Sequence, residues 1–344
     1  MNTAHHRIGI VGRGYALGSD IRTNDDPVFA YVNAHPPANR DLFEGLTYRR
    51  ALADGQTGVS IAVEAAQAAL DQAQLLPRDV DMLLGTVSVG PYYAPSALAS
   101  VHAALKLPDR CRVMALNTEY TAFLDGMKLA HDLIHSGSIG RALVVASVDW
   151  TAHVDYHEAI CVAASDAAGA AVLARTPDTA CFTLLDWDNE THAELYGALR
   201  MAPRPVAAVQ RGRTGPQALF TRPLMELDAS RGAQAVKTFG LAVPPMVVNR
   251  LLAKHGLTGK DITLVAHQTS ELIYGEWNMR IRPACFISTL SELADMVSAG
   301  VPVNLAKCYD QIKTEHLVLL GVGMEMHATA MLYGRNNAGA TLRR

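Results

Sequence analysis

The decisive stretch of this chain is 113-VMALNTEYTAFLDG-126, in which an apolar strand runs directly into the start of a helix. Apolar residues at helical spacing follow the short apolar run, so we predict a strand over 112–117 and a helix over 121–136. Tyr120 lies at the corner between the two elements. The first backbone N–H groups of a helix are unpaired and carry the positive end of its dipole, which makes this corner a candidate for chemistry.

The segments on either side alternate between strand and helix patterns. An Ala-rich helix is predicted over 57–73 and a second helix over 95–107. A turn leads into an apolar strand within 77–87, and another apolar strand is predicted over 141–148. Strands that alternate with helices at this spacing form a mostly parallel sheet with helices on its faces.

The first 44 residues carry a weaker pattern. We predict a short buried strand over 7–12 that ends in a turn at Gly12-Arg13-Gly14. This turn lacks the third glycine of a dinucleotide-binding loop, so no such site is expected there. The stretch 19–44 is polar and rich in proline, and we expect it to form an irregular excursion outside the core.

The second half of the chain repeats the first. The segment 76-LPRDVDMLLGT-86 is echoed by 257-LTGKDITLVAH-267, and 140-GRALVVAS-147 is echoed by 315-EHLVLLGV-322. Two matches in the same order indicate a duplicated α/β unit, with an N-terminal half predicted at 1–175 and a C-terminal half at 176–344.

Three polar residues each follow a predicted strand. Tyr120 lies in the first half, and His267 and Asp295 lie in the second. Parallel sheets bind ligands beyond the carboxyl ends of their strands. We therefore expect these three side chains to meet at one site.

Composition narrows the classes of function. The 344 residues are 49% hydrophobic, with 30 Lys and Arg against 33 Asp and Glu, so a sizeable core is expected and a nucleic-acid partner is not. The first residues lack the apolar region of a signal peptide, and no apolar run has the length of a membrane span, so we expect a cytoplasmic protein without a membrane partner. The five cysteines are scattered, which indicates neither a disulfide framework nor a metal site.

Four further motifs give the chain a family resemblance. They are 264-LVAHQ-268, 165-SDAAGAAVL-173, 92-YYAPS-96 and 317-LVLLGVG-323. In this order the chain resembles thiolase-fold condensing enzymes of the ketoacyl-ACP synthase III class. The resemblance implies a five-layer αβαβα fold. The segments 24-NDDPVFA-30 and 118-TEYTAF-123 are similar to the divergent branch that transfers acyl groups in alkylquinolone and antibiotic pathways, that is, in secondary metabolism.

The resemblance also implies a set of site residues. Such enzymes use a Cys-His-Asn triad, or Cys-His-Asp in the divergent branch, and the cysteine carries the acyl group as a thioester. His267 matches the histidine, Asp295 falls where the family has Asn or Asp, and Tyr120 falls at the cysteine position. Arg49 and Arg50 occupy a segment where family members contact the CoA phosphates; the alternative is a solvated surface pair.

Tyrosine at the nucleophile position changes the expected chemistry. The ordinary pKa is ~10 for tyrosine against ~8.5 for cysteine, and a helix dipole contributes only about 0.3–1 kcal/mol, less than one pKa unit. The phenol therefore stays protonated at pH 7. We favour a pocket-shaping or channel-blocking role for Tyr120 over a covalent one, while its hydroxyl could still orient a carbonyl or act as an acid.

The other candidates also have structural alternatives. His267 could be a packed histidine bonded to a backbone carbonyl, and Asp295 could cap the helix that begins near 298–300. Glu119 is either a buried structural carboxylate, which we favour, or a second acid or base. Cys161 is interpreted as core in an apolar strand. His131 and His135 have metal-ligand spacing, but no H-E-x-x-H pattern accompanies them.

Three functions follow from these residues. The first is an acyltransferase or condensing enzyme that moves an acyl group from CoA or acyl carrier protein to a small-molecule acceptor, with His267 as base, Asp295 as its partner and Tyr120 as a positioning group. The second is a silent subunit that pairs with a cysteine-bearing paralogue, and the third is decarboxylation of a malonyl thioester. The thioester is a substrate, so no cofactor is expected. The resemblance implies a homodimer, because the loop at 92–96 lines the acyl channel across the twofold interface.

Overall fold

The computed structural model describes residues 7–37, 39–92, 94–207 and 219–335. Ten of its strands follow one another in the order β12-β11-β13-β14-β8-β1-β7-β6-β4-β5. β1 and β8 meet at a single residue pair, Gly9 and Thr183, so the ten strands divide into two five-stranded sheets that touch edge to edge. The strand bounds are β1 Arg7–Leu17, β4 Met82–Ser88, β5 Arg112–Ala115, β6 Arg141–Val148, β7 Ala167–Thr176, β8 Thr183–Thr191, β11 Ile262–Ala266, β12 Cys285–Ile287, β13 His316–Gly323 and β14 His327–Gly334.

The two sheets have the same internal pairing. β4 runs parallel to β5 and β6, and β7 is antiparallel to β6 and β1. In the other sheet β11 runs parallel to β12 and β13, and β14 is antiparallel to β13 and β8. The two sequence echoes fall on equivalent strands, β4 with β11 and β6 with β13. The repeated apolar runs are therefore the central strands of each sheet, where burial on both faces selects apolar residues.

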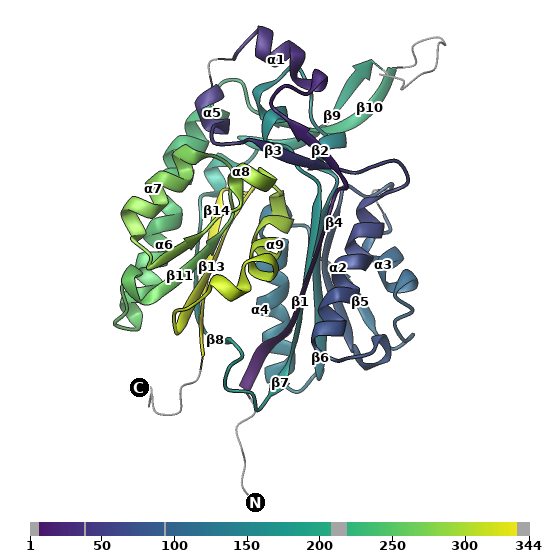
Figure 1. The fold of residues 1–344 in the computed structure, drawn as a ribbon, viewed down its shortest axis with the longest axis vertical. Helices are drawn as coiled ribbons and strands as arrows, with labels where there is room; N and C mark the ends of the chain where they lie inside the picture. The colour runs from purple at the N-terminus through teal and green to yellow at the C-terminus, as the bar shows by residue number, and fades with distance from the viewer. Residues whose placement is uncertain (1–6, 38, 93, 208–218, 336–344) are drawn as a thin grey trace, which may run out of the picture.

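Helices form three layers around the two sheets. Figure 1 shows α2 and α3 outside one sheet, α6 and α7 outside the other, and α4 and α9 between them. This is the five-layer αβαβα arrangement that the resemblance implied. None of the helices in the described part of the chain is both long and apolar enough to cross a membrane. The helix bounds are α1 Ala30–Ala34, α2 Gly58–Gln72, α3 Leu98–Ala104, α4 Ala122–His135, α5 Gly232–Ala235, α6 Leu241–Lys254, α7 Glu271–Ile281, α8 Leu290–Leu293 and α9 Gly300–Lys307.

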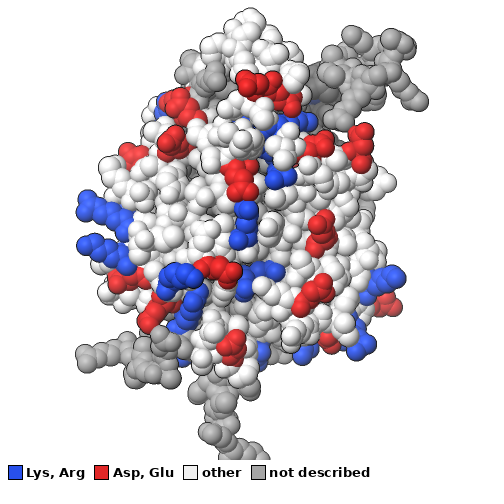
Figure 2. Space-filling model, in the orientation of Figure 1, with Lys and Arg blue, Asp and Glu red and all other residues white. Residues whose placement is uncertain are grey.

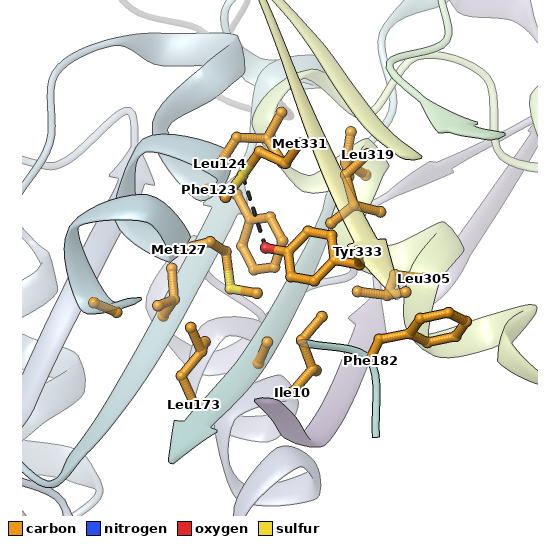
Figure 3. Packing of buried hydrophobic residues seen from close by; sticks show 14 of the residues in the cluster. Ile10, Phe123, Leu124, Met127, Leu173, Phe182, Leu305, Leu319, Met331 and Tyr333 are labelled. Carbon is orange, nitrogen blue, oxygen red and sulfur yellow. Dashed lines mark hydrogen bonds between the residues drawn. The ribbon is translucent and has the colours of Figure 1, made fainter. Parts of the chain in front are cut away.

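Side chains from both halves pack together in the central layer. Tyr333 of β14 lies among Phe123 of α4, Ile10 of β1 and Leu305 of α9, and all four are at most 2% exposed (Figure 3). The Tyr333 hydroxyl donates to Met331 Sδ at 3.8 Å. Because this cluster draws on both sheets and the helices between them, neither sheet buries its inner face alone.

The face in Figure 2 carries interspersed basic and acidic side chains among a larger uncharged area. Two short antiparallel sheets lie beyond the carboxyl ends of the main strands. They are β2 Asp20–Thr23 with β3 Tyr48–Ala51, and β9 Leu199–Ala207 with β10 Leu219–Leu227.

The predicted turn at Gly12-Arg13-Gly14 is wrong, because β1 continues through it to Leu17. A Cβ atom at Gly12 would lie 2.1 Å from the carbonyl oxygen of Ala69, and one at Gly14 would lie 2.2 Å from that of Ala65. The two glycines therefore serve close packing of α2 on the strand. A glycine inside a strand can mark the close approach of another backbone as readily as it marks a turn.

The expectation that 19–44 lies outside the core is also wrong. This stretch contains β2, α1 and two short 3-10 helices, Pro27–Phe29 and Arg40–Phe43. Phe29, Leu42 and Phe43 are buried. The 3-10 helix Arg40–Phe43 turns Leu42 and Phe43 inward, where both line the pocket described next, while Ile21 and Tyr31 stay exposed.

Candidate functional site

Tyr120 occupies the corner that the sequence indicated. β5 ends at Ala115, a 3-10 turn spans Glu119–Thr121, and α4 begins at Ala122. Tyr120 is only 7% exposed, and its hydroxyl donates to Met225 Sδ of β10 at 3.0 Å. The side chain therefore points into the protein rather than along the axis of α4.

The three predicted residues meet at one place. The rings of Tyr120 and His267 lie edge to face, with centroids 4.9 Å apart and planes inclined by 73°. His267 Nε2 lies 3.7 Å from Asp295 Oδ2, which is beyond hydrogen-bond range. His267 lies in the connection after β11, and Asp295 lies in the connection after α8. Two separate connections of the C-terminal half therefore contribute these residues to the site.

A residue that the sequence analysis missed bridges the pair. Thr269 Oγ1 lies 2.7 Å from His267 Nε2 and 3.2 Å from Asp295 Oδ2. The only signal for it in the sequence was its position two residues after the histidine, just before Ser270 caps α7. Asp295 reaches Thr269 with one oxygen, while its Oδ1 accepts from Val297 N at 2.8 Å. Asp295 thus caps the 3-10 turn Val297–Ala299 and faces the histidine at once.

Burial controls the charges of these groups. Desolvation lowers the pKa of His267 to about 4 and raises the pKa of Asp295 to about 8. Desolvation, with smaller contributions from the charges of Asp295 and Glu119, raises the pKa of Tyr120 well above its usual value. Burial therefore favours the uncharged form of each group, namely the neutral imidazole, the carboxylic acid and the phenol.

An apolar pocket adjoins the three groups and encloses ≈ 700 Å³ of empty space, part of it continuous with solvent. Several lining residues come from segments expected to lie outside the core or from the hairpin of β9 and β10. Trp150 also lines the pocket, and its indole N–H has no hydrogen-bond partner within the part of the chain that the structure describes. The lining comprises Leu42, Phe43, Tyr120, Trp150, Ile160, Leu199, Leu227, Val236, Phe239, Gly240, His267, Thr269, Ile273, Trp277, Asp295, Val322, Gly323 and Met326.

The structure does not bring Arg49 or Arg50 into this pocket. Arg49 is 2% exposed, so it is not half of a solvated surface pair. Its Nε donates to the carbonyl oxygen of Val162 at 2.6 Å, and its Nη1 donates to Asn24 Oδ1 at 2.5 Å. Burial lowers its pKa to about 10. Arg50 is half-buried, and its Nε has no hydrogen-bond partner among the residues that the structure describes.

Glu119 and Cys161 are both placed by packing. Ser88 Oγ donates to Glu119 Oε1 at 3.1 Å, while Oε2 has no hydrogen-bond partner in the described ranges. Burial raises the pKa of this carboxyl. Cys161 lies in a 3-10 helix, Ala159–Ala163, and not in a strand as predicted. Burial raises the pKa of its thiol to about 12, which disfavours the thiolate that a nucleophile needs.

Two other sequence candidates lie apart from the pocket. His131 and His135 stack on one face of α4 with ring centroids 6.0 Å apart. Within the described ranges, no three His, Cys, Asp or Glu side chains are grouped as metal ligands. In the loop at 92–96, Tyr92 is 69% exposed and residue 93 lies outside the described residues.

Sequence comparisons agree on one family. The model of the family 3-oxoacyl-[acyl-carrier-protein (ACP)] synthase III matches residues 114–194, the segment that begins within the decisive stretch. A β-ketoacyl-[acyl-carrier-protein] synthase III of Rubrobacter xylanophilus is 24% identical over 340 residues, which cover 97% of this chain and 99% of the relative. Its counterpart from Microcystis aeruginosa is 29% identical over 262 residues, 75% of this chain and 76% of the relative.

Solved structures show the same fold. The 3-oxoacyl-(acyl carrier protein) synthase III of Pseudomonas aeruginosa superimposes with a TM-score of 0.78 at 24% identity, over 97% of this chain and 100% of that structure. OleA of Xanthomonas campestris, solved with bound lauric acid and lauroyl-CoA, gives a TM-score of 0.78 at 18% identity, over 95% of this chain and 99% of that one. The predicted thiolase-like fold is therefore confirmed, and the chain is similar in sequence to β-ketoacyl-[acyl-carrier-protein] synthases III over most of its length.

Proposed function

We propose that the protein is an acyltransferase or condensing enzyme that moves an acyl group from a thioester to a small-molecule acceptor without an acyl-cysteine intermediate. The observation that carries this proposal is the arrangement of His267, which Thr269 bridges to Asp295 in the lining of an apolar pocket. The names of its relatives, β-ketoacyl-ACP synthases III, support the reaction class. The segments 24–30 and 118–123 support a setting in secondary metabolism.

The reaction needs no nucleophile from the protein. The acceptor attacks the thioester carbonyl while His267 takes the proton of the attacking O–H, N–H or C–H group. The tetrahedral intermediate then expels the thiol, which leaves with that proton. Holding donor and acceptor together lowers the activation barrier by several kcal/mol, and by ~7–11 kcal/mol for the best-oriented pairs. The hydroxyl of Tyr120 would position the acyl carbonyl.

The donor we favour is an acyl carrier protein thioester rather than free acyl-CoA. Arg49 already donates to the carbonyl oxygens of Val162 and Thr47 and to Asn24 Oδ1. These bonds occupy a guanidinium that would otherwise hold a CoA phosphate. Acyl-CoA remains the alternative, and Arg50, half-buried in the same strand, is the arginine that would contact it.

The second candidate is a silent partner of a cysteine-bearing paralogue. The observation that favours it is the Tyr120 hydroxyl, which is turned toward Met225. By the family resemblance, the ring of Tyr120 would fill the position of the nucleophile. Malonyl-thioester decarboxylation is a third candidate, because His267 could stabilise an enolate with no nucleophile present.

A twofold assembly fits either candidate. β5 ends the order of the ten-stranded sheet, so one of its edges has no partner strand within the described residues. Val113 and Met114 on this strand are only half-buried, and Tyr92 nearby in sequence is exposed. Exposed edges of this kind are templates for pairing with another chain. We propose a homodimer, with the heterodimer as the alternative.

One experiment separates these functions. The purified protein is incubated with acyl-carrier-protein and acyl-CoA thioesters, with and without amine and alcohol acceptors, while free thiol and intact-protein mass are followed. Acceptor-dependent thiol release without a mass adduct, abolished in His267→Ala and kept in His135→Ala, is expected. His135 is the matched control because it is an exposed histidine. Release with malonyl thioesters alone indicates decarboxylation, and no turnover together with tight binding to a synthase indicates the silent subunit.

A further inference from the structure

Thr269 separates a base from a carboxyl group that do not touch. His267 Nε2 and Asp295 Oδ2 are 3.7 Å apart, while the hydroxyl oxygen of Thr269 lies 2.7 Å from the first and 3.2 Å from the second. All of these groups line the pocket. His267 is 6% exposed and Asp295 is 1% exposed, so bulk water does not replace either contact.

A hydroxyl group has one proton, and this limits the bridge to two arrangements. In the first, Thr269 donates to ionised Asp295 and accepts from Nε2–H of His267, which leaves a lone pair on Nδ1. In the second, protonated Asp295 donates to Thr269, and Thr269 donates to Nε2, which leaves a proton on Nδ1. In both arrangements Nδ1 is the ring nitrogen that has no hydrogen-bond partner among the described residues.

The two arrangements differ by one proton, taken up at Nδ1. When Nδ1 of the first arrangement accepts a proton from a substrate, Nε2–H passes its proton to Thr269 and Thr269 passes its own to Asp295 Oδ2. The imidazole is neutral before and after, and the carboxylate becomes a carboxylic acid. No imidazolium remains inside the protein, where burying an unscreened charge is costly.

We propose that Thr269 is a positioning residue that relays protons between His267 and Asp295, so that a proton taken up at His267 Nδ1 comes to rest on Asp295. The inference rests on the proposed function only where it assigns the proton to a substrate. It also accounts for a difficulty of that function, since a buried imidazole with a pKa of about 4 is a weak base by itself. With the relay, the proton affinity of the assembly is set by Asp295, whose pKa is about 8.

Few other charges face the relay. Tyr120 contacts the His267 ring from the turn before α4, and Glu119 stands beside it in that turn. Glu325, in the connection between β13 and β14, pairs with His327 at the start of β14, with 3.4 Å between Oε2 and Nδ1. No Lys or Arg in the described part of the chain forms an ion pair with Asp295. We therefore expect a pH-dependent change at the His267 ring to report the protonation of the relay and not that of a neighbouring charged group.

Nitrogen NMR of the histidines tests the relay without any substrate. The protein contains 13 histidines, and the His267 signals are assigned by their loss in His267→Gln. Ring nitrogen shifts are then followed from pH 5 to pH 10 in wild type, Thr269→Ser and Thr269→Val. In wild type and Thr269→Ser we expect Nδ1 to lose its proton while Nε2 gains one, with a shared midpoint near that of Asp295.

In Thr269→Val the methyl group keeps the volume but removes the hydroxyl. We expect that the proton of the His267 ring no longer changes from Nδ1 to Nε2 as the pH rises, or that the midpoint of this change moves by roughly one pH unit or more. Asp295→Asn should also hold one tautomer at every pH. Thermal unfolding checks that each variant is folded, and a Thr269→Val variant that does not fold leaves the Thr269→Ser and Asp295→Asn spectra to decide. A folded Thr269→Val that titrates like wild type, or a Thr269→Ser that does not, overturns the relay.

The same spectra distinguish the relay from the proposed function. If no thioester is turned over but the exchange of nitrogens is present, the relay stands and the proposed acyl transfer fails. The pH dependence of the turnover rate is measured in wild type and in Thr269→Val. If both turn over the thioester and lose activity at the same pH on acidification, the function stands and the relay fails.

Discussion

The ring of Tyr120 covers His267 edge to face, with centroids 4.9 Å apart and planes inclined by 73°. From the family resemblance we predict that Tyr120 takes the place of a small thiol, and the structure sets its ring against His267, the proposed base. The contact keeps water from the histidine and fills part of the space next to it. Its removal should change both the size of the pocket and the chemistry available in it.

Replacing Tyr120 by cysteine should make the site accept an acyl group covalently. The smaller side chain opens the pocket, and a thiol next to an imidazole is the arrangement that forms thioesters. We expect a mass increase of one acyl group on incubation of Tyr120→Cys with acyl-CoA, and none for Tyr120→Ala, which opens the same space. An adduct of equal size in wild type would contradict a non-covalent role for Tyr120.

Replacing Tyr120 by phenylalanine should change stability little. The hydroxyl donates only to Met225 Sδ, and a thioether is a weak acceptor. We expect the free energy of unfolding in urea to change by less than ~1 kcal/mol. Acceptor-dependent thiol release should fall several-fold, because the group that positions the carbonyl is gone. Unchanged turnover in Tyr120→Phe would exclude that positioning role.

The titration of Asp295 should make the protein less stable above neutral pH. The pKa of Asp295 is raised from 3.8 to about 8 on folding, so between these values the folded state holds a proton that the unfolded state has lost. The pKa of His267 is lowered from 6.5 to about 4, which gives the opposite slope, but only below pH 6.5. Between pH 6.5 and 8 the free energy of unfolding should therefore fall, by at most about 1.4 kcal/mol per pH unit. Urea unfolding at these two pH values should show the fall in wild type and a smaller one in Asp295→Asn; equal slopes would contradict the shift.

The unpaired N–H of Trp150 should favour an acyl group that carries an oxygen atom. A buried donor without an acceptor costs about 1–3 kcal/mol, which a carbonyl or hydroxyl oxygen of a ligand would recover. We expect a 3-oxoacyl pantetheine to bind about tenfold more tightly than its plain acyl analogue, which corresponds to ~1.4 kcal/mol. Trp187 is an exposed tryptophan, so Trp187→Phe is the control variant, and calorimetry should show the tenfold ratio in it. The ratio should be lost in Trp150→Phe. A ratio that survives in Trp150→Phe would assign the preference elsewhere.

The glycines of β1 should be intolerant of a methyl group. A Cβ atom at Gly14 would lie 2.2 Å from the carbonyl oxygen of Ala65 and 2.5 Å from Ala69 N, both backbone atoms of α2. We expect Gly14→Ala to lower the free energy of unfolding by about 1–3 kcal/mol. At Gly275, within α7, a Cβ atom meets nothing within 4 Å, so Gly275→Ala should raise it by about 0.5–1 kcal/mol. If Gly14→Ala and Gly275→Ala changed the free energy of unfolding in urea equally, α2 would have to move away from β1 without loss of stability, which would contradict the prediction.

Much of the fold could be predicted from local sequence patterns. Apolar runs of strand length recur at 76–86 and 257–267 because each forms the buried centre of a sheet, and α2 was placed to within one residue at each end. The same patterns failed at 12–14 and 19–44. There the deciding contacts are with α2 and with the pocket, and neither is visible in the local spacing of residues.

The candidate site divides in the same way. The sequence by itself determined which residues follow the strands, and it predicted that Tyr120, His267 and Asp295 meet at one site. That Tyr120 takes the place of a nucleophilic cysteine stays a prediction. Only the tertiary structure decided that a hydroxyl group from Thr269 stands between them and that Arg49 is buried away from the pocket. Residue type and order follow from local patterning. Burial, and with it the protonation of every group in the site, depends on which distant segments close over it.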